Sequence, residues 1–215
     1  MSINTQNYFQ IQSSINNTLQ KSELMIVSKN RSIDEIKQYI DLDHHHFGEN
    51  RIQEAKKKFI DSSQLKNKSL KLSLIGPLQS NKTLSALEIF DSIQSIDRTK
   101  IIDEISKFMG RDNNIKTKEF FIQVNIGSEP QKSGIHPKDL KSLFVYATNK
   151  KINIRGLMCI PPNVNNPKKY FDDMVLLRAE LDDKLVLSMG MSNDYQIALD
   201  CGSNIIRVGS LLFND

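Results

Sequence analysis

The sequence predicts an α/β fold, a single (β/α)8 TIM barrel with an extra helix at its N-terminus. Short apolar runs typical of strands alternate with segments of helical spacing, and the 215 residues contain no Gly/Pro-rich linker and no break in composition. Eight runs rich in Ile, Val, Leu and Phe are the predicted strands, at residues 24–27, 45–47, 72–75, 92–96, 120–126, 152–158, 185–189 and 205–208. Two of the eight are weak, so an open doubly wound sheet stays as the alternative.

The segment before the first strand predicts the extra helix. Ile11, Ile15 and Leu19 recur at intervals of four residues, which places them on one face of a helix. We expect that face to pack on the outside of the barrel.

A second helix is predicted directly after the first strand. Ser32 and Glu35 fit a capping box, and the isoleucines that follow recur with helical spacing. Lys29 therefore lies at the carboxyl end of the strand at 24–27. Ligands bind at the carboxyl ends of parallel strands in barrels and in doubly wound sheets, so Lys29 is a candidate functional residue.

Helical spacing is clearest in two later segments, which are Ile101, Ile105 and Phe108, and Tyr170, Met174, Leu177 and Leu181. Pro167 occupies the first helical position of the second of these, where proline is favoured. A further helix is expected over residues 193–200. Ser192 is its predicted N-cap, and Gly202 stands just past its end.

Composition and charge are those of an ordinary globular protein. Hydrophobic residues make up 39 % and charged residues 25 %, which excludes a disordered or fibrous chain. No apolar run approaches the ~20 residues of a membrane span, and the polar start lacks the pattern of a signal peptide, so we expect a cytoplasmic protein without membrane contact. The net charge of +4 is mild. The lysines at 56–58 are interpreted as a solvated helix face, so no nucleic-acid partner is expected.

Two loops late in the chain are candidate phosphate sites. Small residues precede Ser192 after the seventh strand, and a helix start there would present free amides to an anion. Gly209 and Ser210 follow the eighth strand. Barrels commonly bind phosphate in the loops after strands seven and eight. The alternative is that Ser192 only caps a helix and Gly209 only makes a turn.

Other polar segments are ambiguous when taken alone. The segments at 46–54, which includes Asn50, and at 75–83 each combine a glycine with amides and a charge. Such residues could fix loops or face a ligand. The histidines at 44–46 would alternate faces on a strand and lack partners at ligand spacing, so no metal site is expected. Cys159 and Cys201 are too few for a disulfide framework and are interpreted as reduced thiols.

Together the motifs resemble those of one family, the pyridoxal phosphate homeostasis proteins. In chain order they are V-S-K at 27–29, H-F-G-E-N at 46–50, I-G-x-L-Q-S-N-K at 75–82, I-Q-V-N at 122–125, K-S-G at 132–134, R-G-L-M-x-I-P at 155–161, L-S-M-G-M-S at 187–192 and G-S-x-x-x-R-x-G at 202–209. The resemblance runs from about residue 24 to 213 and is highly specific.

The resemblance implies one domain over residues 1–215, like the N-terminal barrel of alanine racemases, that binds pyridoxal 5'-phosphate (PLP). The implied cofactor-binding residues are Lys29, Ser192, Arg207, Gly209, Ser210 and Asn50. In such proteins the lysine of V-S-K holds the cofactor as a Schiff base, and the arginine of R-x-G faces the pyridine nitrogen. The residues of the two late loops hold the phosphate.

The implied function is intracellular PLP homeostasis, by holding and releasing the cofactor with little or no turnover. PLP-dependent apo-enzymes are the expected recipients, and a monomer is expected because nothing requires a second chain at the site. One alternative is a PLP-dependent amino-acid racemase, and another is a barrel lyase that forms a Schiff base without any cofactor. Racemisation needs a base opposite Lys29, which alanine racemases take from an additional domain. The sequence shows no such domain after the eighth strand, so negligible racemase turnover is expected.

Overall fold

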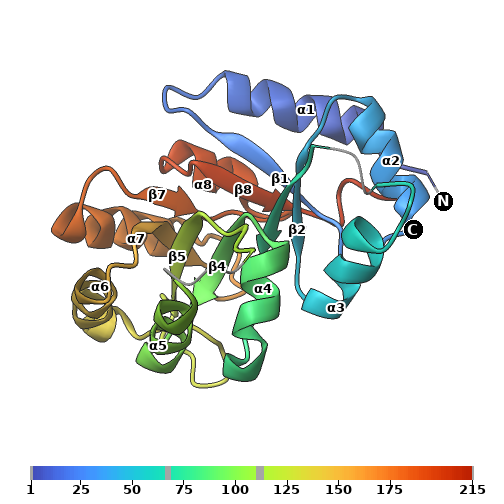
Figure 1. Cartoon of the computed structure of the whole chain (residues 1–215). Helices are drawn as coiled ribbons and strands as arrows, with labels where there is room; N and C mark the ends of the chain where they lie inside the picture. The colour runs from blue at the N-terminus through green and yellow to red at the C-terminus, as the bar shows by residue number, and fades with distance from the viewer. Residues whose placement is uncertain (1, 66–68, 110–113, 215) are drawn as a thin grey trace.

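Residues 2–65, 69–109 and 114–214 are described by a computed structural model, and they form a closed barrel of eight parallel strands (Figure 1). The strands are β1 Glu23–Val27, β2 His46–Glu49, β3 Lys71–Leu74, β4 Ser92–Ile96, β5 Glu119–Val124, β6 Ile154–Cys159, β7 Val186–Ser188 and β8 Ile205–Val208. Each strand pairs with its neighbour in sequence, and β8 closes the ring on β1, where Ile26 lies opposite Val208. The barrel prediction is confirmed and the open sheet is excluded.

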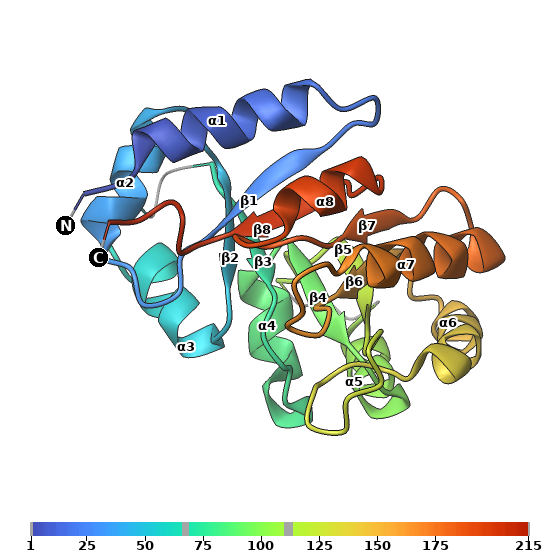
Figure 2. The ribbon, with the colours of Figure 1, turned by 180° about the vertical axis from the view of Figure 1, so that it is seen from behind.

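Helices surround the barrel, as both views show (Figures 1 and 2). They are α1 Thr5–Asn16, α2 Ile33–Asp41, α3 Ile52–Ala55, α4 Thr83–Ile89, α5 Thr99–Phe108, α6 Leu140–Asn149, α7 Lys168–Leu181 and α8 Tyr195–Asp200. A π-helical turn, Lys56–Ile60, continues α3, and short 3-10 turns lie at Ser80–Lys82 and Pro137–Asp139. Within the described ranges, no helix is long and apolar enough to cross a membrane.

The capping box predicted for α2 is present. The Ser32 hydroxyl accepts a hydrogen bond from the Glu35 amide at 3.2 Å, and the Glu35 carboxylate accepts one from the Ser32 amide at 2.7 Å. Each residue satisfies an amide that the first helical turn leaves free. The box fixes where α2 begins and therefore where the loop that carries Lys29 ends.

The extra helix α1 is also confirmed, but it is shorter than the sequence predicts. Ile11 and Ile15 are buried, whereas Leu19 lies beyond the end of the helix and is fully exposed. The Thr18 hydroxyl donates a hydrogen bond to the carbonyl of Ile15 at 2.7 Å. A side chain that bonds the backbone in this way competes with the next helical turn, so the assignment of Leu19 to the packed face was wrong.

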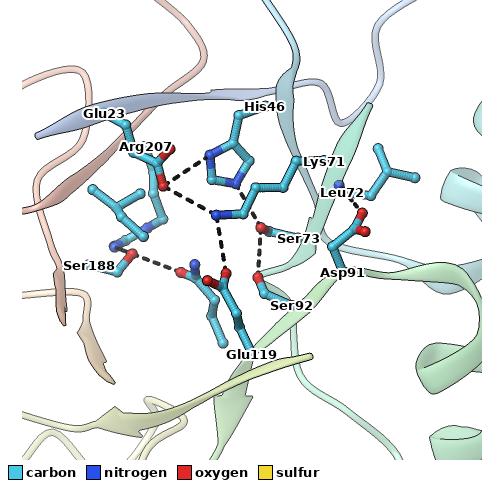
Figure 3. Close-up of polar contacts among 12 residues, drawn as sticks. Glu23, His46, Lys71, Leu72, Ser73, Asp91, Ser92, Glu119, Ser188 and Arg207 are labelled. Atoms are coloured by element: carbon cyan, nitrogen blue, oxygen red, sulfur yellow. Dashed lines mark hydrogen bonds and ion pairs between the residues drawn. The ribbon is translucent and has the colours of Figure 1, made fainter. Parts of the chain in front are cut away.

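The amino ends of the strands carry an ion network (Figure 3). Lys71 of β3 bridges Glu23 of β1 at 3.4 Å and Glu119 of β5 at 3.1 Å. His46 of β2 lies 3.5 Å from Glu23 and 2.8 Å from the hydroxyl of Ser73. These contacts give His46 a role that the sequence does not reveal. They lie at the end of the barrel opposite to the carboxyl ends of the strands.

Loss of the Glu23 charge is expected to lower the free energy of unfolding at neutral pH and to have no effect in strong acid. Burial would raise the pKa of Glu23, but the hydrogen bond and charge of His46, together with Lys71, outweigh it and lower that pKa from 4.5 to about 2. Glu23 therefore stabilises the fold above pH 4.5, and this contribution is lost as the pH falls toward 2. Because the side chain is half-exposed, we expect Glu23→Gln to lower the free energy of unfolding by only ~1 kcal/mol at pH 7.

The difference between Glu23→Gln and wild type should vanish near pH 2, as measured by urea unfolding at a series of pH values. Glu88→Gln is the matched control, because Glu88 is exposed on α4 and has no ion pair among the described residues. A deficit in Glu23→Gln that stays constant from pH 7 to pH 2 would contradict the assigned network.

Candidate functional site

A pocket of about 490 Å³ opens at the carboxyl ends of the strands. It is bounded by the segments that follow β1, β5, β6, β7 and β8. Five of the predicted site residues line it, and they are Lys29, Ser192, Arg207, Gly209 and Ser210. The structure therefore gathers residues that are up to 181 positions apart in the chain, since 210 − 29 = 181. The pocket lies where barrels bind their ligands.

Asn50, the sixth predicted residue, lies elsewhere. It lines a separate pocket of about 470 Å³ together with Gln79 and Lys82. A Cβ added to Gly76 would stand 2.1 Å from the carbonyl oxygen of Asn50, so the backbones of the two loops touch there. The structure thus brings the segments at 46–54 and 75–83 to each other and keeps Asn50 out of the pocket that contains Lys29.

Lys29 reaches the pocket because of the way β1 ends. The Ser28 amide still donates to the carbonyl of Gly48 on β2 at 3.0 Å, so the strand pairing continues one residue beyond Val27. Side chains alternate along a strand, so Ser28 is buried outside the pocket and Lys29 lines it. Asn30 then turns the chain with a φ of 59°. Lys29 is an exposed residue, so a ligand can reach its side chain.

Arg207 of β8 places a buried cation in the pocket. Its guanidinium donates to the hydroxyl of Ser188 at 2.9 Å and to the carbonyl of Cys159 at 2.7 Å. Figure 3 shows the contact with Ser188, whose hydroxyl in turn donates to the side-chain oxygen of Gln94 at 2.7 Å. Burial lowers the pKa of Arg207, although a guanidinium stays charged at neutral pH.

The charge of Arg207 has no carboxylate within ion-pair distance among the described residues. Its hydrogen bonds go to neutral acceptors, which hold the planar group in place without cancelling its charge. Asp194 interacts electrostatically with the Arg207 charge at longer range. Burial raises the pKa of Asp194, and the Met191 amide and Arg207 act in the opposite direction. The pocket is therefore suited to an anionic or electron-rich ligand.

The loop after β7 differs from the prediction. The helix α8 begins at Tyr195, and Asp194 rather than Ser192 occupies the N-cap position. The reason is a local turn, in which the Asp194 carboxylate accepts a hydrogen bond from the Met191 amide at 2.6 Å. The prediction that Ser192 caps the helix was therefore wrong. Its hydroxyl has no hydrogen-bond partner among the described residues, and it lines the pocket.

Gly209 permits a close contact at the seam between β8 and β1. A Cβ at this position would lie 3.3 Å from both the Cβ and the carbonyl oxygen of Val27, which is tighter than ordinary packing. A side chain at this position would require Val27 to shift by a few tenths of an ångström. Ser210 follows at the pocket rim and is exposed.

Two lysines near the site were given no role from the sequence, although Lys132 belongs to the K-S-G motif at 132–134. Lys132 lines the pocket, where it donates to the carbonyl of Pro161 at 3.0 Å and pairs with Glu129 at 2.6 Å. Lys58 is buried, whereas Lys56 and Lys57 are exposed, so the predicted solvated face holds for only two of the three. The one sequence signal for a buried Lys58 was its spacing of four residues from Glu54.

No family model matches the chain, but curated proteins and solved structures do. The pyridoxal phosphate homeostasis protein of Aquifex aeolicus is 38 % identical over 178 residues, which are 79 % of this chain and 76 % of that protein. The protein of the same name from Pasteurella multocida is 36 % identical over 97 % of this chain and 95 % of its own length.

Among solved structures, PipY of Synechococcus elongatus PCC7942 without PLP has a TM-score of 0.82 at 32 % identity, and PipY with PLP bound has 0.79 at 30 %. Both comparisons cover 96 % of this chain and 99 % of PipY. An alanine racemase of Clostridium difficile 630, at 13 % identity and a TM-score of 0.72, shares the fold over 57 % of its chain. The motifs, the barrel and these relatives agree, and the chain belongs to the family of pyridoxal phosphate homeostasis proteins.

Proposed function

We propose that this protein binds pyridoxal 5'-phosphate and serves in its homeostasis, and that Lys29 holds the cofactor covalently. The observation that carries the proposal is the shared pocket, in which a lysine amine, a buried arginine and small residues of two loops meet. The bound PLP in PipY, a protein that this chain matches over 96 % of its length, supports the same ligand.

The residues of the pocket fit the chemistry of this cofactor. When bound, PLP supplies an aldehyde that condenses with a primary amine, and the exposed amine of Lys29 is available. The free hydroxyl of Ser192 would donate to the phosphate, and the chain at Gly209 and Ser210 would approach it closely. A guanidinium such as that of Arg207 would keep a neighbouring ring nitrogen unprotonated.

The proposal treats residues 1–215 as one cofactor-binding domain that acts as a monomer. All proposed contacts come from one barrel, so no second chain is needed to build them. The open side of the pocket and the exposed amine would let the cofactor leave toward PLP-dependent apo-enzymes, which we propose as recipients.

We further propose that the protein binds the cofactor with little or no turnover. Among the described pocket residues, the groups able to move protons are Lys29, Lys132 and Asp194. Lys132 is held by Glu129 and a carbonyl, and no tyrosine, histidine or cysteine lines the pocket in this part of the chain. Racemisation needs a base on each face of the substrate. The Asp194 carboxylate is engaged by a hydrogen bond from the Met191 amide at 2.6 Å. We infer that the racemase alternative lacks a free second base in this pocket.

The test combines spectroscopy with labelling of the purified wild-type protein. Addition of PLP is expected to give a visible absorbance band that borohydride abolishes, and peptide mapping is expected to place the reduced label on Lys29. The loaded protein, incubated with L-alanine, should form no D-alanine beyond one equivalent. Absence of the band, or a label only at surface lysines, would refute cofactor binding at this pocket. Multiple turnovers to D-alanine would favour the racemase.

A further inference from the structure

A buried ion cluster holds the chain on both sides of Lys29. It consists of Ser28, Glu49, Glu54 and Lys58, and we call it the Lys58 clamp. None of the four residues lines the pocket, and three of them are almost fully buried. The clamp lies behind the strand ends of β1 and β2 and joins them to the π-helical turn that follows α3.

The residue before Lys29 is held by two groups of the clamp. The Lys58 ammonium donates a hydrogen bond to the carbonyl oxygen of Ser28 at 2.6 Å. The hydroxyl of Ser28 donates to the Glu49 carboxylate at 2.8 Å, and the same carboxylate oxygen accepts from Lys58 at 2.9 Å. Both the backbone and the side chain of Ser28 are therefore fixed.

The residue after Lys29, Asn30, is held by Glu54 of the clamp. The Asn30 amide donates to the Glu54 carboxylate at 2.6 Å, and that oxygen also accepts from Lys58 at 2.5 Å. Asn30 adopts a φ of 59°, in the left-handed region that residues other than glycine rarely occupy. Asparagine adopts this conformation more readily than most other residues, and the hydrogen bond to Glu54 helps to hold it. Without Lys58, Glu54 would lose its cation and Asn30 much of its support.

Lys58 reaches the strand ends because of the π-helical turn. The Asp61 amide bonds the carbonyl of Lys56 at 2.9 Å, which is the i to i+5 pairing that widens the helix by one residue. Lys56 and Lys57 remain in solvent while Lys58 turns inward. A buried ammonium is costly unless it is paired, and Glu49 and Glu54 provide that pairing. π-helical turns of this kind occur frequently at functional sites.

We propose that Lys58 is a positioning residue for Lys29, and that the clamp fixes the backbone on both sides so that the Lys29 amine faces the cofactor. This inference rests on the proposed function, because it concerns the same amine. Lys58 itself does not line the pocket. A displacement of ~1 Å in a reacting group can lower a rate by about 100-fold, so a clamp that prevents such a shift matters for the covalent step.

The test compares two ligands in two variants. Lys58→Met removes the ammonium and keeps the length of the side chain, and Lys57→Met makes the same change at an exposed neighbour. Pyridoxine 5'-phosphate has the ring and phosphate of PLP but an alcohol in place of the aldehyde, so it reports binding without the covalent step. We expect Lys58→Met to form the borohydride-stable label 10- to 100-fold more slowly, with unchanged affinity for pyridoxine 5'-phosphate. Lys57→Met should match wild type with both ligands.

Equal labelling rates in the two variants would overturn the proposal. If Lys58→Met lowered the affinity for pyridoxine 5'-phosphate as much as the labelling rate, the proposal would also be overturned, because the clamp would then only support the fold. If Lys58→Met does not fold, as judged by circular dichroism of the protein without ligand, Glu54→Gln takes its place and must show the same selective loss. Failure of the proposed function can be told apart from failure of this inference, because in the first case the wild-type protein itself would carry no label on Lys29.

Discussion

Replacing Lys29 with alanine is expected to abolish the visible absorbance band and the borohydride-stable label. Lys29 is an exposed amine in the pocket, and alanine has no group that can condense with an aldehyde. Binding through the phosphate and ring contacts should persist at lower affinity. Absorbance and intact mass after borohydride treatment measure the two effects separately.

Lys132→Ala is the matched control for this variant. Lys132 supplies the other ammonium of the same pocket, but it is engaged with Glu129 and with the carbonyl of Pro161. The label should remain on Lys29 in this control. A Lys29→Ala protein that is labelled as fully as wild type, with the label on Lys132, would contradict the assignment of one reactive amine.

Replacing Ser192 with aspartate is expected to weaken PLP binding by about 100-fold. The substitution removes a free hydroxyl and places a carboxylate beside the proposed phosphate. Two unit charges ~4 Å apart repel by ~4 kcal/mol at an effective dielectric constant of ~20, and solvent at this half-exposed loop reduces that value. Each 1.4 kcal/mol corresponds to about tenfold in affinity. Fluorescence or absorbance titration with PLP gives the dissociation constants.

Ser106→Asp makes the same change of charge on α5, away from the pocket, and should bind PLP as wild type does. The apo-proteins should unfold at similar temperatures, because Ser192 makes no hydrogen bond within the described chain. Equal affinity of Ser192→Asp and wild type would remove the loop after β7 from the phosphate site and leave only Gly209 and Ser210.

Much of the fold could be predicted because local signals agreed with it. Alternating strands and helices, the Ser32 capping box and the packing of Ile11 each depend on residues close together in sequence. Errors arose where a side chain competed with the expected backbone pattern. Thr18 ended α1 before Leu19, and the Asp194 carboxylate delayed the start of α8. Both are short polar side chains that bond nearby backbone groups, and sequence spacing does not show which bond forms.

The candidate site was predicted only in part, because some of its contacts join residues that are far apart in the sequence. Lys29 was expected from its place at a strand end and Arg207 only from the motif resemblance, and the barrel brings the two to one pocket. Asn50 lines a different pocket, where the backbone of its loop lies against Gly76. The burial of Lys58 depends on a π-helical turn and on contacts with two strand ends. A run of three lysines in a sequence predicts neither the π-helical turn nor the contacts with the strand ends.

The pairing of β1 with β8 also has a consequence for synthesis of the protein on the ribosome. The pocket takes Lys29 from one side of this seam and Arg207, Gly209 and Ser210 from the other. A nascent chain that has emerged only as far as β7 exposes the amine but none of the β8 contacts. Under the proposed function, selective capture of the cofactor would begin only when the last strand docks. An occupied pocket would then link the first and last strands and stabilise the closed barrel at the β1–β8 pairing.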